Sequence, residues 1–129
     1  MDYPKDLKYT REHEWIKLEG DTATVGITDY AQDALGDIVF IELPKKGAAV
    51  EKGKAAAVVE SVKSVSDVYS PVTGTVLEVN QKLNDNPDVV NKKPYTDGWM
   101  FKASVKDRKQ LDGEMNSDEY AKHVAEQSH

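Results

Sequence analysis

Two short runs of β-branched residues with one lysine between them constrain the fold more than any other feature. Lys63 stands near the middle of these runs, whose β-branched members are Val58, Val59, Val62, Val65 and Val68. Branching at Cβ stiffens a side chain and favours an extended backbone, so the runs predict two neighbouring strands. Gly53 stands ten positions before the lysine and Gly74 eleven positions after it. The spacing predicts a strand, turn, strand unit with the amine at its tip.

A lysine at a hairpin tip has two interpretations. It is either an ordinary solvated turn residue or an attachment point, from which a bound group swings on a flexible four-carbon stem. From spacing alone the ordinary turn residue is the simpler interpretation, because the segment lacks the Asn-Gly or Asp-Gly pair of the tightest hairpins. The choice between them depends on the rest of the chain.

Alternation of apolar and polar residues predicts further strands, because side chains in a strand point to opposite faces in turn. The expected strands are residues 13–18, 22–27, 37–43, 49–50, 75–79 and 98–105. Pro44 to Gly47 and Pro71 to Gly74 are similar turn signatures, each followed by a strand, which suggests an internal pseudo-repeat. Residues 84–87 and 91–94 are expected to be loops.

Two helices are expected beside the strands. Thr28 or Asp29 can cap a short helix near residues 28–35, and Gly36 supplies its left-handed stop. Residues 117–127 have helical spacing, within a helical tail that covers about residues 106–127. The pattern therefore predicts a mainly β chain, built as a flattened barrel or sandwich of two short sheets. Its 129 residues fit one domain, residues 1–129.

Composition narrows the classes of function. The chain has 17 Lys and Arg against 23 Asp and Glu, and this net charge of −6 argues against a nucleic-acid surface. It has no cysteine, so sulfur redox chemistry would have to come from an attached group. Its longest apolar run, residues 55–59, is far shorter than the roughly 20 residues of a membrane span. Residues 1–6 show no targeting pattern, so we expect a bacterial cytoplasmic protein or the mature form of a mitochondrial one.

Residues that could form an independent active site are few. His13, His123 and His129 lack the spacing of metal ligands, and no phosphate-binding loop or serine nucleophile motif is present. The acids that could in principle pair for proton transfer are better explained as solvated surface charge; they are Glu12, Glu14, Glu60 and Asp67. Trp15 and Trp99 fit core or cleft packing. The profile favours a carrier over a catalyst.

The lysine segment resembles that of a known family. Glu60-Ser61-Val62-Lys63, then Ser66-Asp67 and Pro71-Val72-x-Gly74, is similar to the lipoyl-attachment segment of the H proteins of the glycine cleavage system. Further similar segments follow in the same order: Leu7-Lys8-Tyr9, His13-Glu14-Trp15, Val25-Gly26-Ile27-Thr28, Leu35-Gly36-Asp37, Glu42-Leu43-Pro44, Val90-Asn91 and Gly98-Trp99. The resemblance runs from about Leu7 to Phe101.

The resemblance implies a barrel-sandwich hybrid with a lipoyl hairpin at residues 54–79 and lipoic acid joined to Lys63 by an amide. Glu60, Ser61 and Val62 would form the sequence context for a lipoate ligase or octanoyltransferase. The implied protein is a monomeric carrier without catalysis of its own, which receives the aminomethyl group of glycine from a pyridoxal-phosphate glycine decarboxylase. It passes that group to a tetrahydrofolate-dependent aminomethyltransferase, and a dihydrolipoyl dehydrogenase then reoxidises the arm.

The resemblance also makes Glu14 and Asp67 candidates to hold the aminomethyl amine in a cleft, by charge-assisted hydrogen bonds. Otherwise Glu14 is a surface acid at a strand end and Asp67 a solvated hairpin residue. The sequence departs from some members, with Glu12 in place of serine and Ala34 in place of histidine.

Other classes remain open beside the glycine cleavage carrier. Biotin carriers typically have methionine beside the lysine, and lipoyl domains of 2-oxoacid dehydrogenases usually have Asp before it, whereas this chain has Val62 and Ser64 as neighbours. Sequence hardly distinguishes the glycine cleavage carrier from an H-like relay protein, which donates lipoate to other proteins or acts in redox signalling. An enzyme acting alone is disfavoured by the absence of a nucleophile, metal set or cofactor loop.

Overall fold

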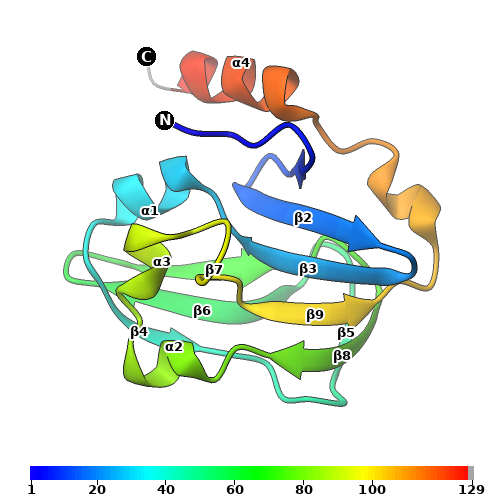
Figure 1. Cartoon of the computed structure of the whole chain (residues 1–129), viewed down its shortest axis with the longest axis horizontal. Helices are drawn as coiled ribbons and strands as arrows, with labels where there is room; N and C mark the ends of the chain where they lie inside the picture. The colour runs from blue at the N-terminus through cyan, green and yellow to red at the C-terminus, as the bar shows by residue number, and fades with distance from the viewer. Residues whose placement is uncertain (128–129) are drawn as a thin grey trace.

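The computed structural model describes residues 1–127, which form two antiparallel sheets with helices at their margins (Figure 1). The strands are β1 (Lys8–Tyr9), β2 (Glu14–Glu19), β3 (Thr22–Ile27), β4 (Ile38–Glu42), β5 (Ala49–Val50), β6 (Ala55–Ser61), β7 (Val65–Tyr69), β8 (Gly74–Val79) and β9 (Phe101–Ser104). One sheet has the order β1-β2-β3-β9-β8-β5, and the other β4-β6-β7. The predicted mainly β, two-sheet class is confirmed, and no closed barrel forms within residues 1–127.

The predicted lysine hairpin is the β6–β7 pair. Its register places Val59 opposite Ser66 and Glu60 opposite Val65. The span 54–79 also contains β8, which pairs with β5 and β9 in the six-stranded sheet. The chain therefore leaves one sheet for the other between Tyr69 and Gly74, and the hairpin itself covers only β6, β7 and the turn between them.

The two glycines that flank Lys63 serve different purposes. Gly53 has a φ of 85°, in the left-handed region that favours glycine. Gly74 is required by a close approach, since a Cβ there would lie 1.7 Å from the backbone oxygen of Ser104 on β9. The strands that follow the two similar turns pair with each other, with Ala49 opposite Thr75. The suspected pseudo-repeat thus brings its two strands side by side.

The helices are α1 (Asp29–Leu35), α2 (Lys82–Asp85), α3 (Val89–Lys92), a 3-10 helix at Arg108–Leu111, and α4 (Ser117–Gln127). The caps predicted for the first helix are confirmed: Thr28 Oγ1 accepts from the N–H of Ala31, and Gly36 has a φ of 80°. The loops predicted at 84–87 and 91–94 are partly wrong, because one-turn helices occupy the first residues of each. Leu83 and Val90 are fully buried and draw these turns onto the core.

The last strand is shorter than the predicted 98–105, because β9 begins only at Phe101. Met100 lies just before this strand, although its N–H donates to the carbonyl of Val25 on the neighbouring strand β3.

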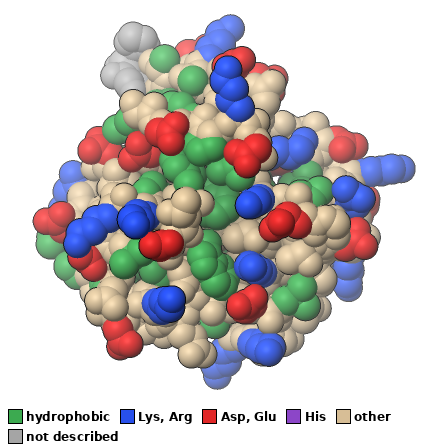
Figure 2. Space-filling model, viewed as in Figure 1, with side chains coloured by type: hydrophobic (Ala, Val, Ile, Leu, Met, Phe, Trp, Pro, Cys, Tyr) green, Lys and Arg blue, Asp and Glu red, His purple; other side chains and the backbone are tan. Residues whose placement is uncertain are grey.

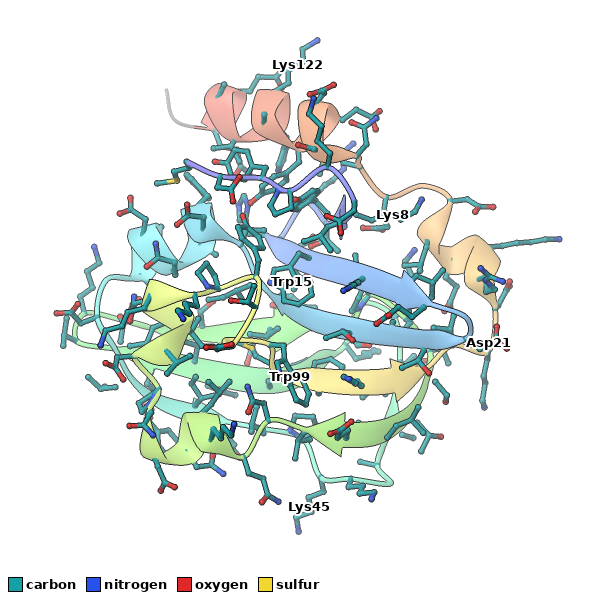
Figure 3. The ribbon with its side chains drawn as sticks, in the orientation of Figure 1. Lys8, Trp15, Asp21, Lys45, Trp99 and Lys122 are labelled. Atoms are coloured by element: carbon teal, nitrogen blue, oxygen red, sulfur yellow. The ribbon has the colours of Figure 1, made fainter. Side chains whose placement is uncertain are left out.

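Figure 3 shows Trp15 on β2 and Trp99 just before β9, while Lys45 and Lys122 extend from opposite ends of the molecule. Lys102 of β9 places its Nζ 5.2 Å from the Trp99 ring centre.

The first half of strand β2, residues 14–16, is buried on both faces, which explains why the core has two parts. Ile16 packs into the cluster between the sheets, whereas Trp15 joins a second cluster with Leu7, Tyr9, Tyr120 and Val124. This second cluster lies under α4, which covers the N-terminal segment (Figure 1). The predicted C-terminal helix is thus confirmed, and it is part of the packed structure.

The surface carries mixed charge. Figure 2 shows basic and acidic side chains interspersed over the viewed face, with apolar side chains gathered below α4. No helix among residues 1–127 is long and apolar enough to cross a membrane.

Candidate functional site: an exposed lysine beside an acid-lined cavity

Lys63 lies in the three-residue turn between β6 and β7 and is exposed. Val62 and Val65 beside it are 68% and 65% exposed, so the tip presents apolar side chains next to the amine. Ser61 shapes the turn: its Oγ accepts from the N–H of Ser64 at 3.1 Å and from that of Lys63 at 3.3 Å. A hydroxyl that bonds the backbone two residues on is typical of a tight turn, so the turn is held without any contribution from the lysine side chain.

The tip is also tied to the segment that follows α1. The N–H of Val62 donates to the carbonyl of Asp37 at 3.0 Å. Asn91 fixes this segment from the other side, because its amide donates to the carbonyl of Gly36 and accepts from the N–H of Ile38, both at 2.9 Å. Lys63 also lies against this segment. Its Cε is 3.4 Å from the position that a Cβ would occupy if residue 36 were not glycine.

A cavity of about 160 Å³ opens next to this segment. Its apolar wall comes largely from α1 and the inner face of the lysine hairpin: Ile27, Tyr30, Ala31, Ala34, Leu35, Val59 and Val68. Its polar wall contains Glu12, His13, Glu14, Ser66 and Asp67. The structure therefore brings Glu14 and Asp67 onto one cavity, although 53 positions separate them. We call this space the arm cavity.

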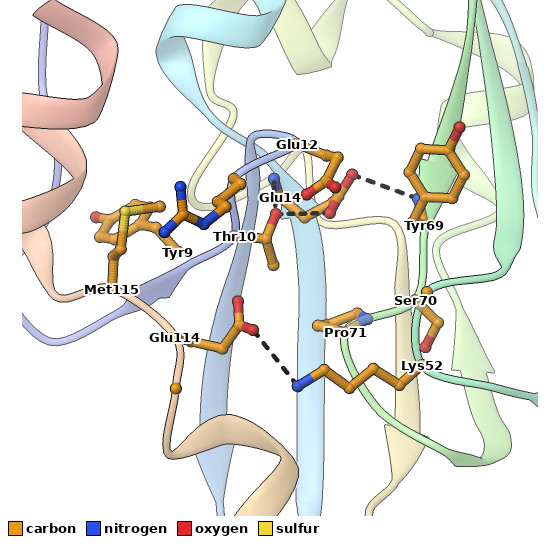
Figure 4. Close-up of a pocket in the computed structure, with 13 residues that line it drawn as sticks. Tyr9, Thr10, Glu12, Glu14, Lys52, Tyr69, Ser70, Pro71, Glu114 and Met115 are labelled. Atoms are coloured by element: carbon orange, nitrogen blue, oxygen red, sulfur yellow. Dashed lines mark hydrogen bonds and ion pairs between the residues drawn. The ribbon is translucent and has the colours of Figure 1, made fainter. Parts of the chain in front are cut away.

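Glu14 is 2% exposed, so the alternative of a surface acid at a strand end is wrong. Its Oε1 accepts from the hydroxyl of Thr10 at 2.6 Å, and its Oε2 from the backbone N–H of Tyr69 at 3.3 Å (Figure 4). The carboxylate thereby links β2 to β7, which belong to different sheets. Asp67, by contrast, is exposed on β7.

Burial dominates the electrostatics of Glu14. Removal from water disfavours the charged carboxylate and raises the pKa of Glu14 to about 7, although the bonds from Thr10 and Tyr69 act in the opposite direction. Glu14 therefore changes its charge near neutral pH. A cation that enters the arm cavity would favour the ionised form and lower this pKa again.

The raised pKa of Glu14 predicts a pH-dependent stability. Between about pH 4.5, its ordinary pKa, and about pH 7, the native state binds more protons at this site than the unfolded state. The contribution of Glu14 to the free energy of unfolding is thus fully present below pH 4.5 and is lost as pH rises through 7. We expect the unfolding free energy of wild type to fall relative to Glu14→Gln over this range, by up to about 3 kcal/mol. Urea unfolding at several pH values measures the difference, and parallel pH curves for the two proteins would contradict it.

A second and larger cavity, of about 570 Å³, lies on the other side of Glu14. Lys52 and Glu114 form an ion pair at 3.5 Å across it (Figure 4). Burial raises the pKa of Glu114, with Lys52 opposing the shift. This cavity shares Glu12 and Glu14 with the arm cavity, but no residue between 54 and 68 lines it. The arm cavity is therefore the one that the strands of the lysine hairpin line on both sides of the turn, with Val59 before it and Ser66 to Val68 after it.

Sequence reasoning missed two parts of this site. Thr10, whose hydroxyl donates to the Glu14 carboxylate and accepts from the Glu14 N–H, has no motif to mark it. The burial of Glu14 did have a signal, because Glu14 shares its strand face with Ile16, which is fully buried. Glu12 and Ala34, the two departures from the family pattern, both line the arm cavity.

No group of three or more possible metal ligands occurs within residues 1–127, and His129 lies outside that range.

Comparisons with known proteins agree on one family. The sequence model described as "Glycine cleavage H-protein" matches residues 7–127. The Glycine cleavage system H protein of Marinobacter nauticus is 56% identical over 123 residues, which cover 95% of each chain. That of one strain of Thermus thermophilus is 55% identical over 120 residues, 93% of this chain and 94% of its own.

A solved structure gives the same result. The crystal structure of a glycine cleavage system H protein from Mycobacterium marinum superposes with a TM-score of 0.88 at 36% identity, covering 95% of this chain and 99% of that one. Fold and sequence therefore indicate the same family. This chain belongs to the glycine cleavage H-protein family.

Proposed function

We propose that this chain is the lipoyl carrier of a glycine cleavage system, with lipoate attached at Lys63. The observation that carries the proposal is the position of Lys63, exposed on a preformed turn of the hairpin whose strands line a cavity with apolar and acidic walls. When bound, the lipoyl group would supply the disulfide that accepts an aminomethyl group and two electrons. The chain would contribute presentation and shelter, without catalysis of its own.

The residues of the arm cavity suit such a group. Aliphatic side chains from α1 and β6 offer an apolar surface for a hydrocarbon arm, and the carboxylates of Glu14 and Asp67 suit an amine at its end. The segment around Gly36, which adjoins Lys63, leads directly to Leu35 on the cavity wall. Hence an arm that starts at Lys63 could reach the cavity without rearrangement of the hairpin.

Glu14 and Asp67 would act differently on the cargo. Glu14 is buried and held by two hydrogen bonds, so it offers a fixed acceptor whose negative charge strengthens when an ammonium group approaches. Asp67 is exposed at the edge of the hairpin and would close the site from the solvent side. Glu12 adds a third carboxylate to the same wall.

Glu14→Gln and Asp67→Asn are expected to speed loss of the aminomethyl group from the loaded carrier. Each change keeps the side-chain size but removes the charge that pairs with the amine, and a charge-assisted bond is roughly twice as strong as a neutral one. We expect an increase of about tenfold or more for Glu14→Gln, equivalent to about 1.4 kcal/mol, and a smaller one for exposed Asp67→Asn.

The rate is measured as formaldehyde and ammonia released from purified loaded carrier in the absence of partner enzymes. Glu19→Gln, at the far end of β2 and away from the arm cavity, is the matched control. Release rates that match the control in both variants would remove Glu14 and Asp67 from the proposal.

The implied partners are a pyridoxal-phosphate glycine decarboxylase, a tetrahydrofolate-dependent aminomethyltransferase, a dihydrolipoyl dehydrogenase, and a lipoate ligase or octanoyltransferase. We propose that the chain meets them as a monomeric single domain in the bacterial cytoplasm, and the bacterial origin of the relatives supports that location. The alternative of a lipoyl relay protein uses the same lysine. The acid-lined arm cavity favours the glycine cleavage role, because a relay of lipoate alone carries no amine.

A further inference from the structure

One oxygen atom of the C-terminal helix joins two walls of the arm cavity. Tyr120 of α4 is fully buried, and its hydroxyl lies 2.8 Å from Nδ1 of His13 and 2.7 Å from Oγ1 of Thr28. His13 belongs to the loop before β2, between Glu12 and Glu14 of the acidic wall. Thr28 caps α1, which supplies much of the apolar wall. The two segments also touch directly, since the N–H of Thr28 donates to the carbonyl of His13 at 3.0 Å.

The backbone at His13 needs support from its surroundings. Its φ is 75°, and it is the one non-glycine residue at positive φ within residues 1–127. Such a conformation is disfavoured for residues with a Cβ and persists only where neighbouring structure fixes it. The His13 ring lies between α4 and α1: besides Tyr120, the ring centre of His123 on α4 lies 5.7 Å away, and that of Tyr30 on α1 lies 4.8 Å away.

We propose that Tyr120 is a positioning residue for the arm cavity, with its hydroxyl holding the His13 loop against α1. Glu14 follows His13 directly, so the same clamp sets where the buried carboxylate stands relative to α1. This gives the C-terminal helix a part in sheltering the cargo, in addition to covering the second core cluster. The inference rests on the proposed function, because the cargo is the aminomethyl group assigned there.

Tyr120→Phe is the test, because it removes the hydroxyl but keeps the ring, which stacks on Tyr9 at 4.7 Å. Tyr9→Phe is the matched control. Tyr9 is equally buried in the same cluster, but its hydroxyl donates to the carbonyl of Pro4 at 2.6 Å, away from the arm cavity. Tyr120→Phe loses the two hydrogen bonds of a buried tyrosine hydroxyl and Tyr9→Phe loses one, and the variants differ in whether those bonds join the cavity walls.

Two measurements are made on each variant. In the loaded carrier, Tyr120→Phe is expected to release the aminomethyl group at least threefold faster than wild type, and Tyr9→Phe at the wild-type rate. In the unmodified chain, the imidazole NMR signals of His13 are expected to shift or broaden in Tyr120→Phe alone. Equal release rates in the two variants would overturn the inference, whatever the His13 signals show.

Failure of the inference is distinguishable from failure of the proposed function. If loaded wild type loses the aminomethyl group as fast as free lipoamide carrying the same group, the proposed shelter is absent. If wild type protects the group and Tyr120→Phe protects it equally well, only the role of Tyr120 is wrong. The NMR measurement needs no lipoate and reports on the clamp itself.

Discussion

Lys63→Arg is expected to abolish both the attachment of lipoate and glycine turnover while leaving the fold intact. The guanidinium of arginine keeps the positive charge but does not form the amide bond that attachment needs. The turn itself depends on Ser61 Oγ and on the bond between Val62 N–H and the Asp37 carbonyl, and neither involves the lysine side chain. The free energy of unfolding should therefore stay within about 0.5 kcal/mol of wild type.

The measurement combines the intact mass of the expressed chain, urea unfolding, and glycine turnover with the partner enzymes. Lys54→Arg is the matched control, since Lys54 is an exposed lysine immediately before β6 at the opposite end of the same hairpin. It should be lipoylated and active. A Lys63→Arg chain that still gains the lipoyl mass would show that the attachment site is elsewhere.

Gly74→Ala is expected to have the largest effect on stability. A Cβ at this position would lie 1.7 Å from the backbone oxygen of Ser104 and 3.1 Å from its Oγ. A backbone oxygen within a paired strand cannot rotate away as a side chain can, so β8 and β9 would have to separate locally. Overpacking of this kind costs about 1–3 kcal/mol and sometimes more, and we expect at least about 3 kcal/mol here.

Gly113→Ala provides the control for Gly74→Ala, because a Cβ at Gly113 meets nothing within 4 Å. Its unfolding free energy should differ from that of wild type by about 0.5 kcal/mol or less. Urea unfolding of the three proteins measures both effects. A Gly74→Ala protein as stable as Gly113→Ala would mean that β8 and β9 are not packed as closely as described.

Local patterns predicted the parts of the fold that depend on neighbours in sequence. The alternation around β2 and β3, the Thr28 cap and the Gly36 stop all act within a few residues, and all are observed. The lysine hairpin was predicted for the same reason. The sequence predicts loops where α2 and α3 end because their Asn residues and the prolines that follow them are turn signals, whereas the burial of Leu83 and Val90 decides the conformation.

The candidate site was predictable only in part, because its contacts join distant segments. The hairpin pattern marks Lys63 and the family resemblance marks Glu14 and Asp67, and the structure places the two acids on one cavity. The strand face that Glu14 shares with Ile16 signals its burial, but the bond from the Tyr69 N–H on β7 to its carboxylate joins segments 55 positions apart, and no local pattern records it. The bond between Tyr120 and His13 spans 107 positions, and the positive φ of His13 has no sequence signal.

Reconstitution of glycine cleavage tests the carrier role itself. The chain is prepared with and without lipoate on Lys63, with peptide mapping to locate the modification, and is mixed with glycine decarboxylase, aminomethyltransferase and dihydrolipoyl dehydrogenase. We expect the lipoylated chain to support many turnovers of glycine per carrier, and the unmodified chain and Lys63→Arg to support none. A lipoylated chain that supports no turnover with these three enzymes, while donating its lipoate to other proteins, would contradict the carrier role and establish the relay function instead.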